Sequence, residues 1–192
     1  MGKFKIIFRK DNGVMLIEPA VFQDCRGYFS ETYNRADLAE IGIVNDFIQD
    51  NESLSSYGVV RGLHFQTLPY TQAKLVRVIS GRVLDVAVDI RRNSPDFGKI
   101  FTAELSGENH RQFYIPRGFA HGFAVLSETA LFAYKCDNIY HPASERGIAF
   151  NDPELAIDWQ IPADKMILAA KDLKHPAFKD AEVFDASGDN LL

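Results

Sequence analysis

The chain has 192 residues and a formal net charge of −5, with 46% hydrophobic and 24% charged residues. This length fits one domain, so we expect residues 1–192 to form a single domain with its core at about 13–172 and a tail at 173–192. The negative net charge argues against nucleic-acid binding, which depends on clustered cations. Met1–Lys10 contains no long apolar run, so we expect neither a signal peptide nor a membrane span.

The two cysteines, Cys25 and Cys136, lack the spacing of a metal site or of a CxxC redox motif. In a chain of this size they are typical of reduced intracellular thiols. We therefore expect a cytoplasmic protein.

Short β-branched and aromatic runs alternate with turn signals along the chain, which predicts a mainly β-strand structure. The predicted strands are 13–17, 28–33, 47–53, 59–65, 74–80, 82–90, 101–105, 112–115, 121–125 and 130–137. One helix is predicted over Arg35–Ile41, with Asn34 as its N-cap. The tail from Asp152 onward is expected to wrap the strands with short helices.

Two turns connect these predicted strands. The segment 24–27, Asp-Cys-Arg-Gly, is expected to join the first two strands, and Ser80-Gly81 is expected to close a hairpin between 74–80 and 82–90. The near-regular spacing of the strands favours a sandwich or barrel over an α/β fold. The sequence therefore predicts one all-β domain.

The segment Arg61–Gln66 places a histidine and an amide within a predicted strand. Alternation puts His64 and Gln66 on one face with Gly62, and Leu63 and Phe65 on the other. This pattern suits the interior of a barrel that holds a polar ligand. A single histidine of this kind is more often a structural residue, so this segment alone leaves the question open.

Two later segments carry further polar groups. A turn at Pro116–Gly118 delivers His121 at the start of a strand, and the run 132–136 places Tyr134 on the same face as Phe132 and Cys136. A tyrosine that faces a barrel interior must satisfy its hydroxyl. Taken by itself, Tyr134 is interpreted as a packed core residue.

The spacing of Gly58, His64, Lys74, Gly81 and the later Pro-x-Gly-x-x-His resembles the two motifs of cupins. Cupins that bind a metal use three histidines and a glutamate as ligands. Here Gln66 stands where the second histidine is expected and Lys74 lies close to the expected glutamate. An amide is a poor ligand for a transition metal and an ammonium group repels one. We therefore expect no metal and no cofactor, with His64 acting as a free base.

Longer segments resemble the dTDP-4-dehydrorhamnose 3,5-epimerase family over about residues 13–172. The matching segments are 24–31, 49–53, 61–66, 72–76, 85–91, 94–98, 115–123 and 151–153. Each motif is weak alone, whereas eight in the same order are specific. The resemblance implies a cupin jelly-roll β-barrel with a few short peripheral helices.

The resemblance also implies catalytic roles for four residues. His64 matches the base that removes a proton next to the 4-keto group of a dTDP-linked hexose, and Asp172 matches its carboxylate partner. Tyr134 matches the acid that delivers a proton from the opposite face. Lys74 matches the lysine beside the ketone oxygen, where it would stabilise an enolate in place of a metal.

The remaining residues implied by the resemblance bind the substrate. They are Arg26, Arg61 and Lys171 near the diphosphate or sugar, the polar positions Glu31, Gln49, Asn51, Gln66, His121 and Glu145, and the aromatic Phe29, with Tyr140 as a weaker match. In relatives the 26–31 strand comes from the neighbouring subunit. This implies a homodimer with strand exchange and shared sites. Without the resemblance, Glu31, Glu145 and Lys171 would be interpreted as solvated surface charges.

The implied activity is conversion of dTDP-4-dehydro-6-deoxy-D-glucose to dTDP-4-dehydro-L-rhamnose, a precursor of bacterial cell-envelope polysaccharide. Two alternatives remain open: an epimerase that acts at C3 or C5 alone on a related sugar, and a non-catalytic cupin that binds a nucleotide sugar. The chain departs from the family at Ala169-Ala170, where Ser-Glu is common, and at Phe65, where Tyr is common.

Overall fold

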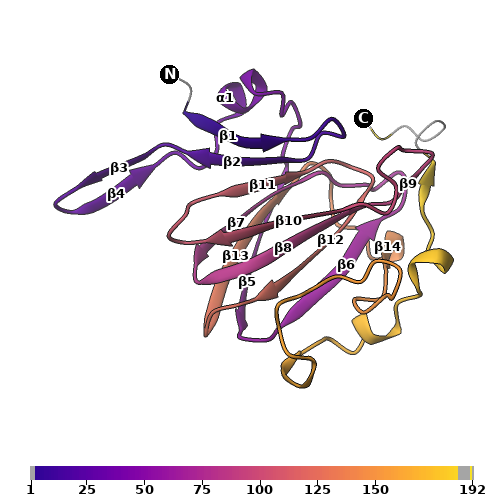
Figure 1. Ribbon diagram of the computed structural model, residues 1–192. Helices are drawn as coiled ribbons and strands as arrows, with labels where there is room; N and C mark the ends of the chain where they lie inside the picture. The colour runs from indigo at the N-terminus through magenta and orange to yellow at the C-terminus, as the bar shows by residue number, and fades with distance from the viewer. Residues whose placement is uncertain (1–2, 186–190, 192) are drawn as a thin grey trace.

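Two antiparallel β-sheets form the body of the protein in the computed structural model, which describes residues 3–185 and 191 (Figure 1). The six-stranded sheet has the order β1 (Phe4–Arg9), β2 (Met15–Pro19), β11 (Gln112–Ile115), β7 (Lys74–Ser80), β13 (Thr129–Cys136) and β5 (Gln49–Ser56). The five-stranded sheet has the order β10 (Ile100–Ser106), β8 (Arg82–Asp89), β12 (Phe119–Val125), β6 (Val60–Gln66) and β14 (Glu145–Gly147). Strands distant in sequence lie next to one another, as in a jelly roll.

Strict alternation along β8 explains how the two sheets pack. Val83 and Ala87 belong to the buried cluster between the sheets, whereas Leu84 and Val86 belong to a second buried cluster on the outer face of the five-stranded sheet. Because both faces are covered, the strand is apolar at nearly every position. The exception in the middle of the strand is Asp85, which is fully buried and alternates to the inner face, while Arg82 and Asp89 stand at the two ends.

The C-terminal part of the chain covers that outer face. Buried residues after the last long strand, including Leu155, Trp159 and Phe178, pack on it, and the indole of Trp159 donates a hydrogen bond of 2.8 Å to the carbonyl of Phe150. The expected short helices are confirmed as the 3₁₀ turns η2 (Ala163–Lys165), η3 (Asp172–Lys174) and η4 (Phe178–Asp180), with η1 (Pro142–Ser144) before them. The last strand, β15 (Phe184–Asp185), pairs in parallel with β9 (Arg91–Arg92).

The predicted strands and the helix are confirmed with small shifts at their ends. The helix α1 spans Arg35–Glu40, and the Asn34 side chain accepts hydrogen bonds from the amides of Ala36 and Asp37, as expected of an N-cap. Strands β1, β3, β9, β14 and β15 were not expected. No helix among residues 3–185 is long and apolar enough to cross a membrane.

The predicted hairpin at Ser80-Gly81 is wrong. Strand β7 pairs with β11 and β13, while β8 pairs with β10 and β12, so the chain crosses from one sheet to the other at Gly81. Gly81 has a φ of +80°, and a Cβ there would lie 2.0 Å from the carbonyl oxygen of Thr129. A tight turn fixes only the change of direction and does not decide which strands pair.

The turn at 24–27 is confirmed, but it joins a strand that was not expected. It connects β3 (Val21–Asp24) to β4 (Gly27–Ser30), and within the part of the chain that the structure describes these two strands pair only with each other. The resulting hairpin projects from the two sheets (Figure 1). Phe22, Tyr28 and Phe29 on it are 62%, 59% and 67% exposed. We call residues 21–30 the arm.

Candidate active site

A cavity of about 820 Å³ opens between the two sheets at the end where β6, β7, β12 and β13 come together. Twelve residues singled out from the sequence line it: Gln49, Asn51, Arg61, His64, Gln66, Lys74, His121, Tyr134, Tyr140, Glu145, Lys171 and Asp172. They come from both sheets and from the C-terminal segment. The fold therefore gathers residues that lie more than a hundred positions apart.

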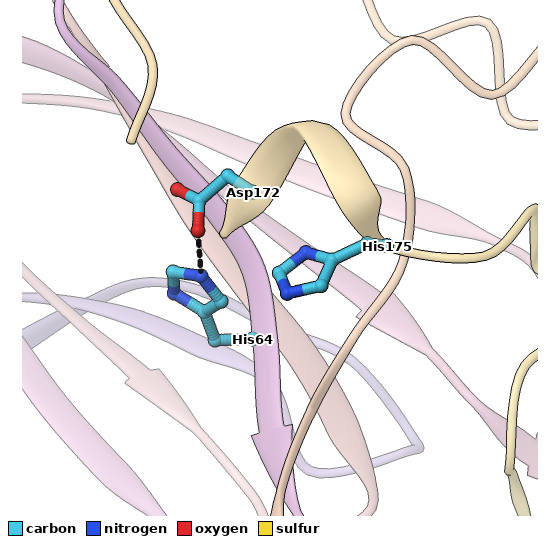
Figure 2. A group of neighbouring side chains, drawn as sticks. All are labelled: His64, Asp172 and His175. Atoms are coloured by element: carbon cyan, nitrogen blue, oxygen red, sulfur yellow. Dashed lines mark hydrogen bonds and ion pairs between the residues drawn. The ribbon is translucent and has the colours of Figure 1, made fainter. Parts of the chain in front are cut away.

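His64 and Asp172 form a polar pair in the wall of this cavity. The Nε2 atom of His64 lies 2.8 Å from Oδ1 of Asp172, whose side chain is only 2% exposed (Figure 2). Burial alone would raise the pKa of Asp172, but the hydrogen bond from His64 and one from the backbone of Gly62 hold that pKa below its usual value. Asp172 is thus a carboxylate, and it fixes the Nε2–H tautomer of a neutral His64 ring.

Strand pairing places His64 beside a second histidine. His64 on β6 is the direct partner of His121 on β12, so the two side chains leave the sheet on the same face. The register shifts immediately afterwards, where a Cβ on Gly62 would lie 2.6 Å from the Cα of Gly122. The two glycines allow the bulge that aims both imidazoles into the cavity.

His121 links Lys74 to the buried Asp85. Its Nε2 lies 3.1 Å from both carboxylate oxygens of Asp85, and its Nδ1 lies 3.4 Å from Nζ of Lys74. With Asp85 accepting from Nε2–H, the Nδ1 lone pair is available to the ammonium group. Burial lowers the pKa of both Lys74 and His121. The chain of three groups therefore orients the lysine toward the cavity.

Tyr134 lies on the opposite wall, on β13. As the alternation predicted, it shares this face with Phe132 and Cys136, and Nζ of Lys74 lies 5.9 Å from the centroid of its ring. Burial raises the pKa of Tyr134, with a further contribution from Cys136. The same burial raises the pKa of the Cys136 thiol to about 11. Both groups are therefore protonated at neutral pH.

An ion pair closes the cavity on the C-terminal side. Nζ of Lys171 lies 2.6 Å from one oxygen of Glu145, and the hydroxyl of Tyr140 donates to the other oxygen at 3.0 Å. Burial alone would raise the pKa of Glu145, but these two hydrogen bonds hold it below its usual value. Glu145 and Lys171 thus form one ion pair at the border of the cavity, and the side chain of Lys171 is 56% exposed.

Several lining residues are already committed to the protein's own hydrogen bonds. The amide of Gln66 donates to the carbonyls of Tyr70 and Ile139 and accepts from the amide of His141. Gln49 donates to Asn51 at 3.0 Å. Gln66 thus supports the loops that border the cavity.

Three predicted binding residues are not brought to this cavity within one chain. Arg26 and Phe29 lie on the arm, where Arg26 pairs with Asp24, and Glu31 pairs with Lys3 at 2.9 Å just after the arm. The physical reason is that the arm projects away from both sheets (Figure 1).

Sequence reasoning missed Asp85 and His175. Asp85 could have been found as the one charged residue in the middle of an apolar strand, between the charged ends Arg82 and Asp89, at a position that alternates to the inner face. His175 lies beside the pair of His64 and Asp172, with its ring 5.3 Å from that of His64 (Figure 2). At the two departures from the family pattern, the carbonyl of Ala169 accepts a hydrogen bond of 3.0 Å from the amide of Asp172, and Phe65 packs on the outer face against Phe184.

Comparisons with known proteins agree on one family. The sequence model of the dTDP-4-dehydrorhamnose 3,5-epimerase family matches residues 10–180. A dTDP-4-dehydrorhamnose 3,5-epimerase of Methanothermobacter thermautotrophicus is 46% identical over 96% of this chain and 100% of its own length. The crystal structure of the Legionella pneumophila dTDP-6-deoxy-D-glucose-3,5-epimerase in complex with dTDP-4-keto-L-rhamnose has a TM-score of 0.91 and 46% identity, over 95% and 98% of the two chains. A 3′-monoepimerase from Streptomyces bikiniensis, in complex with dTDP-quinovose, has a TM-score of 0.80 and 30% identity over 86% and 84%.

Proposed function

The chain belongs to the dTDP-4-dehydrorhamnose 3,5-epimerase family, and on this premise we propose how its residues carry the reaction. The protein is an isomerase that converts dTDP-4-dehydro-6-deoxy-D-glucose to dTDP-4-dehydro-L-rhamnose. Each inversion, at C3 and at C5, needs a base on one face of the carbon and an acid on the other. The observation that carries the proposal is the 2.8 Å contact between His64 and Asp172 in a cavity also lined by Lys74 and Tyr134.

His64 is the base. With Nε2–H donated to Asp172, its Nδ1 lone pair is free to take the proton from the carbon next to the ketone. The ring becomes an imidazolium, and the adjacent carboxylate stabilises that charge without accepting the proton itself. Since Asp172 is buried and its pKa is depressed, the negative charge is present throughout the neutral range.

Lys74 stabilises the enolate that forms when the proton leaves. Its ammonium group is buried, and a charge in such a site interacts more strongly with a developing oxyanion than it would in water. The hydrogen-bond chain through His121 to Asp85 holds that group in place before substrate binds. This arrangement supplies the electrostatic role that a metal has in other cupins.

Tyr134 is the acid. It lines the wall across the cavity from β6, so a sugar bound between the two walls meets His64 on one face and Tyr134 on the other. Its raised pKa keeps the phenol protonated until the enolate needs a proton. Removal from one face and return to the other inverts the carbon.

The arm completes the site of a second copy in a homodimer. Its exposed aromatic residues, Phe22, Tyr28 and Phe29, are the kind of surface that protein partners bury. Arg26 at its tip offers a forked donor suited to a diphosphate, and it is 85% exposed within one chain. The other anion-binding groups, Arg61 and Lys171, already line the cavity, so the arm would add the missing contact to the nucleotide.

The protein is proposed to act in the cytoplasm and to supply a precursor of cell-envelope polysaccharide. Both cysteines are unpaired, Cys25 at the exposed tip of the arm and Cys136 in the cavity wall. Free thiols are usual in a reducing compartment. Fractionation of cells with an antibody against the chain would test this location, and recovery with the envelope fraction would contradict it.

The activity is tested by incubating dTDP-4-keto-6-deoxyglucose in D₂O with wild type or with His64→Ala and following the sugar by NMR. We expect deuterium at both C3 and C5 with wild type and at neither with the variant. Label at only one carbon would favour the single-site epimerase. Tight binding of the nucleotide sugar with no exchange at all would favour a non-catalytic binding protein.

A further inference from the structure

His175 is held against the base and its carboxylate by a short turn. Asp172 and His175 are three residues apart across the 3₁₀ turn η3, and side chains at this spacing lie on the same side of such a turn. The ring of His175 meets that of His64 edge-on, with centroids 5.3 Å apart and an interplanar angle of 89° (Figure 2). None of the catalytic steps above uses this histidine.

Gly147 leaves room for His175 in that position. Gly147 pairs directly with His64 across β14 and β6, and a Cβ on it would lie 2.2 to 2.5 Å from three atoms of the His175 ring. Any other residue at 147 would push the ring away from the pair. The Nδ1 atom of His175 is buried there and has no hydrogen-bond partner among the residues that the structure describes.

The three side chains together offer a set of metal ligands. One ligand atom from each of His64, Asp172 and His175 lies within 4.8 Å of the other two, and together they comprise two imidazoles and one carboxylate. This set suits Zn²⁺, which takes nitrogen and oxygen ligands at about 2.0–2.2 Å. The nearby Lys171 would repel a cation, but it is paired with Glu145 at 2.6 Å, so its charge is largely balanced.

We propose that His64, Asp172 and His175 bind a Zn²⁺ ion that inhibits the enzyme. Zinc takes the lone pair of His64 Nε2, and the proton that Nε2 donated to Asp172 is carried instead on Nδ1 of the same neutral ring. The ring keeps one proton in total, but the lone pair that would remove the substrate's proton is gone. The ion therefore blocks the base without changing the rest of the cavity. This inhibitory effect rests on the proposed role of His64, whereas binding of the ion does not.

The test uses Zn²⁺ alone as the probe and measures binding and activity separately. Equilibrium dialysis followed by metal analysis gives the number of ions per chain and their affinity, while the deuterium-exchange assay gives the inhibition. The key variant is His175→Phe, which keeps an aromatic ring against Gly147 but removes both nitrogens. The control is His110→Asn, which removes an imidazole outside the cluster and suits the φ of 53° at that position.

We expect wild type and His110→Asn to bind one Zn²⁺ per chain and to lose activity as it binds. In His175→Phe both binding and inhibition should be weaker by roughly tenfold or more, since one of three ligands is missing. Mg²⁺, which prefers oxygen ligands, should inhibit none of the three proteins. Equal zinc binding by wild type and a folded His175→Phe, or no binding by wild type, would overturn the proposed site. Binding that depends on His175 in a protein without epimerase activity would instead refute the proposed function alone.

Discussion

Asp172 accepts a hydrogen bond from His64 across 108 positions of sequence, at 2.8 Å, and the side chain of Asp172 is only 2% exposed. The strand β6 supplies the histidine and the 3₁₀ turn η3 supplies the carboxylate, so the pair forms only after the C-terminal segment has folded back on the five-stranded sheet. The base therefore depends on the tail as much as on the barrel.

Replacing Asp172 by Asn tests this dependence. The amide keeps the size of the side chain but loses the charge that stabilises the imidazolium and fixes the tautomer. We expect kcat to fall by roughly 10²- to 10⁴-fold with a smaller change in KM. Steady-state kinetics on the folded variant measure this, and an unchanged kcat would show that His64 works without its partner.

The same variant should alter the pH dependence of stability. The pKa of Asp172 is lower in the folded chain than the usual value near 3.9, so its charge stabilises the fold above that value. This contribution is lost as the pH falls through the depressed folded-state pKa. As the pH falls from about 5 into stronger acid, the difference in free energy of unfolding between wild type and Asp172→Asn should shrink. Urea unfolding at a series of pH values gives the curve, and a difference that grew in acid would have the wrong sign.

Asp85 should act at a distance from the substrate through His121 and Lys74. In Asp85→Asn the amide can present its NH₂ to His121, so the imidazole is free to change tautomer and no longer offers Nδ1 to the lysine. We expect kcat to fall by roughly tenfold or more, about 1.4 kcal/mol, with KM nearly constant. We also expect the alkaline limb of the plot of kcat against pH to shift in Asp85→Asn. A simple loss of packing would lower kcat without shifting that limb. An unshifted profile with normal kcat would contradict it.

Mixed dimers test the proposed exchange of the arm. A copy with His64→Ala carries an intact arm, and a copy with Arg26→Ala carries an intact base. If the arm completes the partner's site, each mixed dimer has one site with both groups intact. We expect mixtures of the two weak variants, refolded together, to recover activity above the sum of their separate activities. A strictly additive result would contradict the exchange.

Gly81 sets the point where the chain changes sheets. Gly81→Ala should destabilise the fold by about 1–3 kcal/mol or more, because φ is +80° and the new Cβ would overlap the carbonyl of Thr129. Gly27→Ala is the control, since φ is also positive there but nothing lies within 4 Å of the new Cβ. Denaturant unfolding should show the larger loss for Gly81→Ala. Equal losses would mean that the close approach at Thr129 has no cost.

The strands were predictable because their alternation is local. His64 and Gln66 face the cavity while Phe65 faces away, as the period of two requires. The same local signal could not tell that β7 and β8 lie in different sheets, since pairing depends on contacts with β11, β13, β10 and β12. The sequence therefore predicted the longer strands and which of their residues face the interior, but not the order of the strands in the sheets.

The site residues were predictable to different degrees. His121 followed from a cupin motif, and the family resemblance suggested Tyr134 and Asp172. Asp85 and His175 required the three-dimensional structure, because their importance comes from contacts to His121 and His64 that no sequence spacing encodes. Arg26 shows the opposite case, since its motif is plain but its place in the proposed site depends on a second chain.

The most direct measurement compares solvent-deuterium exchange in Tyr134→Phe and His64→Asn. If His64 is the base and Tyr134 the acid on the opposite face, Tyr134→Phe still removes protons and returns them to the same face. We therefore expect this variant to incorporate deuterium into recovered substrate of unchanged configuration, while His64→Asn incorporates none and both form little product. Exchange that survives in His64→Asn and disappears in Tyr134→Phe would reverse the assignment of base and acid and contradict the mechanism.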